Sequence, residues 1–166
     1  MPDAAALPNL RIGLGYDSHR IVPGGPLQVG GISIPWDHHL DGHSDADVVL
    51  HALTDALLGA ICQQDIGRLF PNTSDDNADR DSGDFVDEAM RRVRAESMQV
   101  VNLDCVILAE RPKMAPHIDQ MRQAISERLG VDRNQVSVKA KTGEGVGEIG
   151  NGQSMACRVV VLLAGQ

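Results

Sequence analysis

The fold is decided by the stretch Cys157-Arg-Val-Val-Val-Leu-Leu-Ala164, which is apolar on both of the faces that a strand presents. A near-continuous apolar strand is typical of the middle of a sheet, where other parts of the protein cover both faces. We therefore expect residues 157–164 to form a central strand, and the rest of the fold is built outward from it.

Further strands are predicted before this stretch. Runs rich in β-branched and other apolar residues favour strands at 11–16, 100–108 and 136–140. Between the first two of these, Leu27-Gln-Val29 and Ile32-Ser-Ile34 flank the dipeptide Gly30-Gly31. A Gly-Gly pair suits the tight turn of a hairpin, so residues 26–35 are predicted to form one.

Three helices are predicted from apolar residues at helical spacing. The first spans Asp45 to Gln63, with Ser44 and Asp47 resembling a capping box at its start. The second spans 83–97 and follows an acidic stretch, 75–84, that is expected to be a solvated loop. The third begins at Pro112 and ends at Gly130, with apolar positions at Ile118, Met121, Ile125 and Leu129.

Strands interspersed with helices indicate an α+β fold, an open mixed sheet with helices on one face. The 166 residues suit a single domain, 1–166, of which 1–9 is a loose N-terminal extension. The uncovered sheet face needs a partner, and association of identical chains into a symmetric homo-oligomer is the hypothesis that follows.

Composition narrows the class of protein. Apolar residues make up 42% of the chain and aromatic residues only 2%, so the core is expected to be aliphatic. The net charge of −8 argues against a partner that is nucleic acid or an anionic membrane.

Three cysteines, Cys62, Cys105 and Cys157, stand apart among apolar neighbours and are predicted to be small buried hydrophobes. With no signal-peptide pattern and no apolar run long enough to span a bilayer, we expect a cytoplasmic protein.

A metal site is predicted from three side chains. Asp17 and His19 are two residues apart on or just after the first strand, so they point to the same side. His51, from the first helix, would complete a set of two nitrogens and one oxygen, which suits zinc and leaves a fourth position open. Taken singly, the alternatives are a polar strand end for Asp17 and His19, and a satisfied core histidine for His51.

Two acids flank His51 by one helical turn, Asp47 at i−4 and Asp55 at i+4. They are candidates for second partners of the metal-bound imidazole, orienting it through its other ring nitrogen. A solvated helix face is the alternative.

Three other segments carry chemistry. His43 and Ser44 precede a helix N-terminus, which favours phosphate, although Ser44 could simply cap the helix. Asp65-Ile-Gly67 could bind polyol hydroxyls or could be an ordinary turn. Pro112-Lys-Met114 lies between a strand and a helix, a place suited to phosphate and a flat base, or to a plain helix start at proline.

Seven ordered motifs between about Arg11 and Gly165 together resemble one family, the 2-C-methyl-D-erythritol 2,4-cyclodiphosphate synthases of non-mevalonate isoprene biosynthesis. They are Arg11-Ile-Gly-Leu-Gly-Tyr-Asp17-Ser-His19, Gly30-Gly31-Ile-Ser-Ile-Pro35, His43-Ser-Asp-Ala-Asp47, Leu50-His51-Ala-Leu-Thr-Asp55-Ala-Leu-Leu-Gly-Ala60, Asp65-Ile-Gly-Arg-Leu-Phe-Pro71, Pro112-Lys-Met-Ala-Pro-His117-Ile118 and Val138-Lys-Ala-Lys-Thr142-Gly-Glu144.

The resemblance implies a lyase that converts 4-diphosphocytidyl-2-C-methyl-D-erythritol 2-phosphate to the cyclic diphosphate and releases CMP. It implies a homotrimer around the sheets, with active sites at the subunit interfaces. It also implies two cofactors, zinc or another divalent metal in each site and magnesium or manganese bound with the substrate.

The resemblance also implies roles for individual residues. His43 and Thr142 are catalytic, Asp17, His19 and His51 bind zinc, and Glu144 binds the second divalent ion. The rest of the substrate is bound by Ser44, Asp65, Ile66, Gly67, Phe70, Pro71, Asn72, Thr73 and Ser74. The nucleotide is bound by Ala109, Pro112, Lys113, Met114, Ala115, Ala140, Lys141, Thr142, Gly143 and Glu144.

Some positions depart from the pattern of the family. Asn72 stands where an acid is frequent, and Lys141 and Gly143 stand where small hydroxyl residues are frequent. Glu148 and Asn151 replace an apolar residue and an arginine near the trimer axis, so weak or no binding of an isoprenoid diphosphate is expected there.

Two other functions stay open from the residues. The metal constellation alone does not distinguish cyclisation from attack by water, so another zinc-dependent phosphoryl hydrolase is the first alternative. A trimeric protein with structural zinc is the second, and the open coordination position argues against it, because structural zinc normally has four protein ligands.

Overall fold

The computed structural model describes residues 9–42, 44–70 and 80–165. The strands are β1 (Leu10–Pro23), β2 (Leu27–Val29), β3 (Ile32–Ile34), β4 (His38–Leu40), β5 (Met98–Leu108), β6 (Val136–Lys141) and β7 (Ser154–Gly165). The helices are α1 (Val48–Ala60), α2 (Ile66–Leu69), α3 (Ser82–Ala95), α4 (Ile118–Leu129) and α5 (Gly147–Gly150), with 3₁₀ turns at Ala115–His117 and Arg133–Gln135.

The main sheet has five strands in the order β4-β1-β7-β5-β6, and its β5–β6 pair is parallel while the other pairs are antiparallel. β7 lies in the middle, as the apolar run 157–164 predicted. The predicted hairpin is confirmed as well, because β2 and β3 pair with Val29 opposite Ile32 across the Gly30-Gly31 turn. The sheet is therefore mixed, and the α+β prediction is confirmed.

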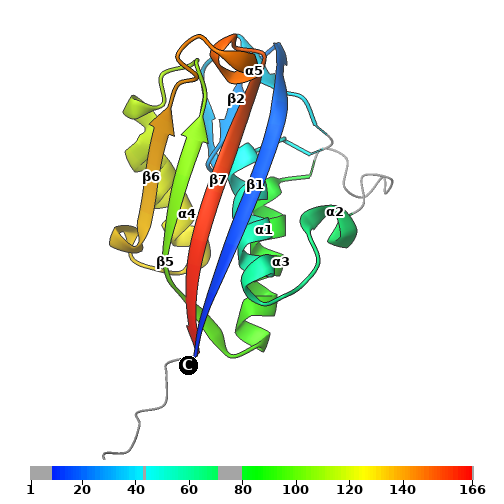
Figure 1. Ribbon diagram of the computed structural model, residues 1–166, viewed down its shortest axis with the longest axis vertical. Coiled ribbons are helices and arrows are strands. Elements are labelled where there is room, and N and C mark those ends of the chain that lie inside the picture. The colour runs from blue at the N-terminus through cyan, green and yellow to red at the C-terminus, as the bar shows by residue number, and fades with distance from the viewer. Residues whose placement is uncertain (1–8, 43, 71–79, 166) are drawn as a thin grey trace, which may run out of the picture.

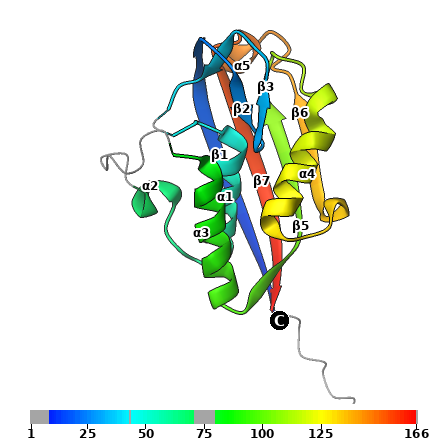
Figure 2. The same cartoon turned by 180° about the vertical axis from the view of Figure 1, so that it is seen from behind.

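The helices α1, α3 and α4 lie on one face of the main sheet. Figure 1 shows the sheet in front of them, and the half turn of Figure 2 brings them to the front. Among the described elements, no helix covers the other face. Ile12, Leu14 and Tyr16 of β1 and Val160 of β7 remain exposed there. They alternate along β1 with Gly13 and Gly15, which are buried on the helix side.

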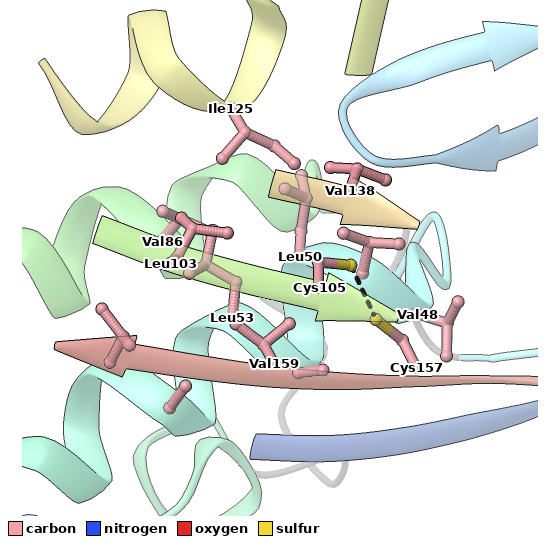
Figure 3. Packing of buried hydrophobic residues seen from close by; sticks show 14 of the residues in the cluster. Val48, Leu50, Leu53, Val86, Leu103, Cys105, Ile125, Val138, Cys157 and Val159 are labelled. Atoms are coloured by element: carbon pink, nitrogen blue, oxygen red, sulfur yellow. Dashed lines mark hydrogen bonds between the residues drawn. The ribbon is translucent and has the colours of Figure 1, made fainter. Parts of the chain in front are cut away.

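The core is aliphatic, as the composition predicted. Figure 3 shows Leu53 of α1 and Ile125 of α4 gathered over Leu103 of β5 and Val159 of β7, all of them buried. Cys105 and Cys157 are buried in the same layer, with their sulfur atoms 3.3 Å apart. The prediction that Cys62 is buried is wrong, because it follows the end of α1 and is exposed.

Two predicted helix starts are corrected. α1 begins at Val48 rather than Asp45, because Asp47, not Ser44, is its N-cap and accepts the backbone N–H groups of Val49 and Leu50. The predicted capping box at Ser44 is therefore wrong. α4 begins at Ile118 rather than Pro112, after a 3₁₀ turn. In the described part of the chain, no helix has the length and apolarity needed to cross a membrane.

Candidate functional site

Two glycines bring helix α1 against strand β1. A Cβ atom on Gly15 would lie 1.8 Å from the carbonyl oxygen of Ala52, and one on Gly13 would lie 1.9 Å from that of Ala56. Only hydrogen fits at these two positions, so the helix backbone approaches the strand closely. The next residues on the same side of β1, Asp17 and His19, therefore lie beside His51 of α1.

The three side chains predicted to share an ion converge. Oδ2 of Asp17 lies 2.9 Å from Nε2 of His19 and 3.1 Å from Nδ1 of His51. The two imidazole nitrogens are themselves 3.1 Å apart. One ligand atom from each of the three residues can be chosen so that all lie within 4.8 Å of one another. This is the geometry of a three-ligand metal centre.

The far ring nitrogens of both histidines are already occupied, which makes the donor set fit a metal. Nδ1 of His19 lies 2.9 Å from the backbone oxygen of Asp41. Nε2 of His51 lies 3.0 Å from Oγ of Ser44 and 2.8 Å from Oγ of Ser82. The remaining nitrogen of each ring faces the carboxylate of Asp17. Two imidazole nitrogens and one carboxylate oxygen are a set that zinc accepts in sites with an open fourth position.

Asp47 and Asp55 do not orient His51, and that prediction is wrong. Within the described residues, neither carboxylate forms a hydrogen bond with the imidazole. Asp47 is buried and accepts the N–H groups of Gly30 and Gly31 as well as those that cap α1. Asp55 accepts the N–H of Ile66 at 2.8 Å. Both carboxylates therefore accept hydrogen bonds from backbone N–H groups. Asp47 holds the hairpin turn in place, and Asp55 holds the start of α2.

The electrostatics of the centre follow from its contacts. Burial alone would raise the pKa of Asp17, but hydrogen bonds and charge attraction from His19 and His51 hold it well below its usual range. Burial alone would lower the pKa of His19, but Asp17 and the Asp41 carbonyl outweigh burial and raise it above the ordinary 6.5. Without a cation, the carboxylate therefore stays ionised and favours a proton on His19.

The centre opens into a hollow of about 340 Å³. It is lined by Asp17, His19, Asp41, Gly42, Ser44, His51, Ile66, Gly67, Phe70 and Phe85. Ser44, Ile66, Gly67 and Phe70 were predicted to bind substrate, whereas Asp41, Gly42 and Phe85 were not. Asp65 is the N-cap of α2 and accepts the N–H of Arg68. The predicted residues His43, Pro71, Asn72, Thr73 and Ser74 lie outside the described residues.

A second hollow, of about 660 Å³, lies at the end of the parallel pair β5 and β6. It is lined by Trp36, Ala109, Glu110, Arg111, Pro112, Lys113, Met114, Ala115, Ala140, Lys141 and Thr142. All of the residues predicted to bind nucleotide are in this lining except Gly143 and Glu144, which come directly after Thr142 in the sequence. Oγ1 of Thr142 donates to Oε1 of Glu144 at 3.0 Å, so the predicted cation ligand is tied to the edge of the hollow.

Sequence reasoning missed several residues here. Trp36, Glu110 and Arg111 adjoin predicted residues in space, and the last two also adjoin them in sequence. Ser82 and Asp41 contact the metal-centre histidines from distant parts of the chain, so local spacing gave no signal for them. Among the residues that the structure describes, the two hollows have no lining residue in common.

A model of the YgbB family matches residues 10–164. The chain is 58% identical to the 2-C-methyl-D-erythritol 2,4-cyclodiphosphate synthase of Rhodopirellula baltica, over 93% of each chain. The CDP complex of IspF from Plasmodium falciparum has a TM-score of 0.85 at 32% identity, covering 97% of this chain and 99% of that one. The bifunctional IspDF of Campylobacter jejuni has a TM-score of 0.92 at 34% identity, covering 95% of this chain but 43% of that longer one.

Proposed function

Because this chain belongs to the YgbB family, we propose that it is a 2-C-methyl-D-erythritol 2,4-cyclodiphosphate synthase. Its substrate is 4-diphosphocytidyl-2-C-methyl-D-erythritol 2-phosphate. An oxygen of the 2-phosphate bonds to the β-phosphorus, the bond from that phosphorus to the oxygen bridging to the α-phosphate breaks, and CMP leaves with the bridging oxygen. The observation that carries the proposal is the convergence of Asp17, His19 and His51 in a hollow of matching chemistry.

The metal of this site is proposed to be zinc, held by Asp17, His19 and His51. Bound there, zinc would supply a Lewis acid that polarises a phosphate oxygen. The protein contributes mainly positioning and charge, since phosphoryl transfer needs no protein nucleophile. His43, outside the described residues, is proposed to stabilise the charge of the transition state.

The methylerythritol part of the substrate is assigned to the first hollow. Asp65 and the backbone of Ile66 and Gly67 are proposed to bind its hydroxyls, and Phe70 to close one side. Ser44 and residues 71–74 are proposed to complete the binding site for the methylerythritol part. The short helix α2 supports the assignment, because its cap fixes the peptide groups that would meet the polyol.

The cytidine diphosphate part is assigned to the second hollow. Arg111, Lys113 and Lys141 supply positive charge to a lining that also contains apolar side chains, which suits the phosphates and the base of a nucleotide. Thr142 is proposed to donate to a phosphate oxygen, and Glu144 to hold a magnesium or manganese ion, both of which take oxygen ligands. The CDP in the Plasmodium falciparum relative supports a cytidine nucleotide as ligand.

The active assembly is proposed to be a homotrimer with a site at each subunit interface. The exposed apolar side chains of Ile12, Leu14 and Tyr16 on the uncovered face of the sheet support this association. The separation of the two hollows within one chain also supports it. One subunit would supply the metal half of a site, and its neighbour would supply the nucleotide half.

The test is phosphorus NMR of the purified protein with the substrate and magnesium, before and after removal of zinc by a chelator. Cyclic diphosphate and CMP are expected, lost on chelation and restored by zinc. Linear hydrolysis products would instead identify a phosphoryl hydrolase. No turnover by the zinc-loaded protein would favour a structural role for the metal.

Two variants test the division of roles. His51→Ala is expected to lose zinc and activity while the protein stays folded, because two of three ligands cannot hold the ion well. Asp65→Ala is the comparison, and it is expected to keep zinc and to bind substrate more weakly. Zinc content by atomic absorption and the KM for substrate distinguish them. Full zinc occupancy in His51→Ala would refute the ligand assignment.

A further inference from the structure

The far side of His51 is held by a residue from another helix. Nε2 of His51 lies 2.8 Å from Oγ of Ser82, in the first turn of α3, and 3.0 Å from Oγ of Ser44. Ser82 is fully buried. A buried hydroxyl with a defined set of partners has little freedom to rotate, so the acceptor of its single hydrogen can be identified from its contacts.

That hydrogen belongs to Asp45. Oδ1 of Asp45 accepts a short hydrogen bond from Oγ of Ser82, and Oδ2 accepts the N–H of Ser82 at 3.3 Å. An ionised carboxylate accepts hydrogen bonds and donates none. Because Ser82 gives its only hydrogen to Asp45, its oxygen can only accept a hydrogen bond from His51. Ser82 therefore favours a proton on Nε2 of His51, and a cation would bind Nδ1, the nitrogen that faces Asp17.

The same reasoning fixes the second histidine. Nδ1 of His19 lies 2.9 Å from the carbonyl oxygen of Asp41, which can only accept. Nδ1 of His19 therefore carries a proton, and a cation would bind Nε2, the nitrogen that faces Asp17. Together the two contacts aim Nε2 of His19 and Nδ1 of His51 at the same carboxylate oxygen.

We propose that Ser82 and Asp45 are positioning residues of the metal centre. Through the chain Asp45–Ser82–His51 they hold the imidazole in the Nε2–H tautomer and in the orientation that presents Nδ1 to a divalent cation. Second partners of this kind set the ring orientation and basicity of metal-binding histidines. This inference rests on the metal centre of the proposed function, and it adds helix α3 to the elements that build that centre.

The first test is the affinity of the metal-free protein for Zn²⁺, measured by competition with a chromophoric chelator. Ser82→Ala is expected to weaken zinc binding by about 10- to 100-fold, the usual loss when such a partner is removed. Ser126→Ala is the matched control, because Ser126 is also buried and donates only to the Gln123 carbonyl within α4. The control is expected to bind zinc as the wild type does.

The second test reads the tautomer directly, by ¹⁵N NMR of the histidine rings in the metal-free protein. Wild type is expected to show His51 protonated at Nε2. In Asp45→Asn, the amide oxygen can accept the N–H of Ser82 while the amide nitrogen donates to Oγ. The Ser82 hydrogen is then free to donate to Nε2, and His51 is expected to shift toward the Nδ1–H tautomer. A purely structural role for Asp45 would not move this signal.

The outcomes are distinguishable. Unchanged zinc affinity in folded Ser82→Ala would overturn the proposal, and so would the Nδ1–H tautomer in the wild type. A wild-type protein that bound no zinc would instead refute the metal centre, and the positioning role with it. If Ser82→Ala did not fold, the tautomer in Asp45→Asn would decide, since an unchanged Nε2–H signal would count against the proposal.

Discussion

One oxygen atom, Oδ2 of Asp17, is the meeting point of both imidazoles. In the metal-free protein the carboxylate attracts a proton to His19 and raises the pKa of that imidazole above 6.5. A cation arriving at the centre has to displace that proton, because only the neutral imidazole binds a metal. Zinc binding and protonation of His19 are therefore in direct competition.

This competition predicts that the stability of the metal-free protein and its affinity for zinc change in opposite directions with pH. His19 has a raised pKa in the folded state, so it stabilises the metal-free protein below pH 6.5, and this contribution is lost as pH rises through the raised value. Zinc affinity should instead rise with pH over the same window, by about tenfold per pH unit for one displaced proton, and level off above it. Calorimetric melting of both forms across this window measures the two trends.

His19→Asn is the control for this prediction. It removes the titrating imidazole, so the melting temperature of the metal-free protein should lose the component that falls above pH 6.5. A metal-free wild type whose stability did not fall with rising pH in this range would contradict the described contact between Asp17 and His19.

At the scale of the helices and strands, the contact between β1 and α1 is too close to admit a side chain at Gly13 or Gly15. In Gly15→Ala the added methyl would collide with the backbone of Ala52, and the helix would have to move away from the strand. The backbone itself needs no glycine there, so the cost is steric. A loss of about 3 kcal/mol in the free energy of unfolding is expected from this overpacking. Urea denaturation of the purified variant measures it.

Gly59→Ala is the matched control on the same helix. A Cβ on Gly59 would meet only the carbonyl oxygen of Leu14, at 3.9 Å, which is ordinary contact. Replacing a helical glycine by alanine should then stabilise the protein by about 1 kcal/mol. Equal stability of Gly15→Ala and Gly59→Ala would show that the helix and strand are not packed as described.

The success of sequence reasoning depended on the range of the interactions. The hairpin was predicted to the residue because its turn residues, Gly30 and Gly31, are adjacent in the sequence and lie between the two strands. The start of α1 was missed because Asp47 also holds those two glycines, a contact 16 residues away for Gly31. A local pattern could not show that this carboxylate, rather than Ser44, would be the cap.

The candidate site shows the same limit. Strand alternation placed Asp17 and His19 on one side, and the helix brought His51 to them, as predicted. The partners of the outer ring nitrogen were assigned to Asp47 and Asp55 from helical spacing. They are Ser44 and Ser82 instead, and Ser82 is 31 residues from His51 in the sequence. Such a partner is visible only after α3 has packed beside α1.

At the scale of the whole molecule, the uncovered sheet face controls association. Leu14→Arg would place a charge among exposed apolar side chains without disturbing the core, because Leu14 is 67% exposed in the single chain. The variant is therefore expected to remain folded and to sediment as a smaller species than the wild type. Sedimentation velocity measures the change, and circular dichroism checks the fold.

Gln123→Arg is the charge-matched control, because Gln123 is exposed on α4 behind the sheet and its side chain bonds only the neighbouring Glu127 among the described residues. It should sediment as the wild type does. A wild type that was itself a stable monomer would contradict the proposed trimer.

The separation of the two hollows has a genetic consequence. If each active site combines halves from different polypeptides, a defect in one half can be made good by a neighbour whose defect lies in the other half. His51→Ala and Lys113→Ala proteins, each inactive alone, should regain activity when they are unfolded together and refolded as mixed trimers. Every mixed trimer would contain one interface at which both contributing halves are intact. Two alleles of this gene, each unable to support growth, would then complement each other in one cell.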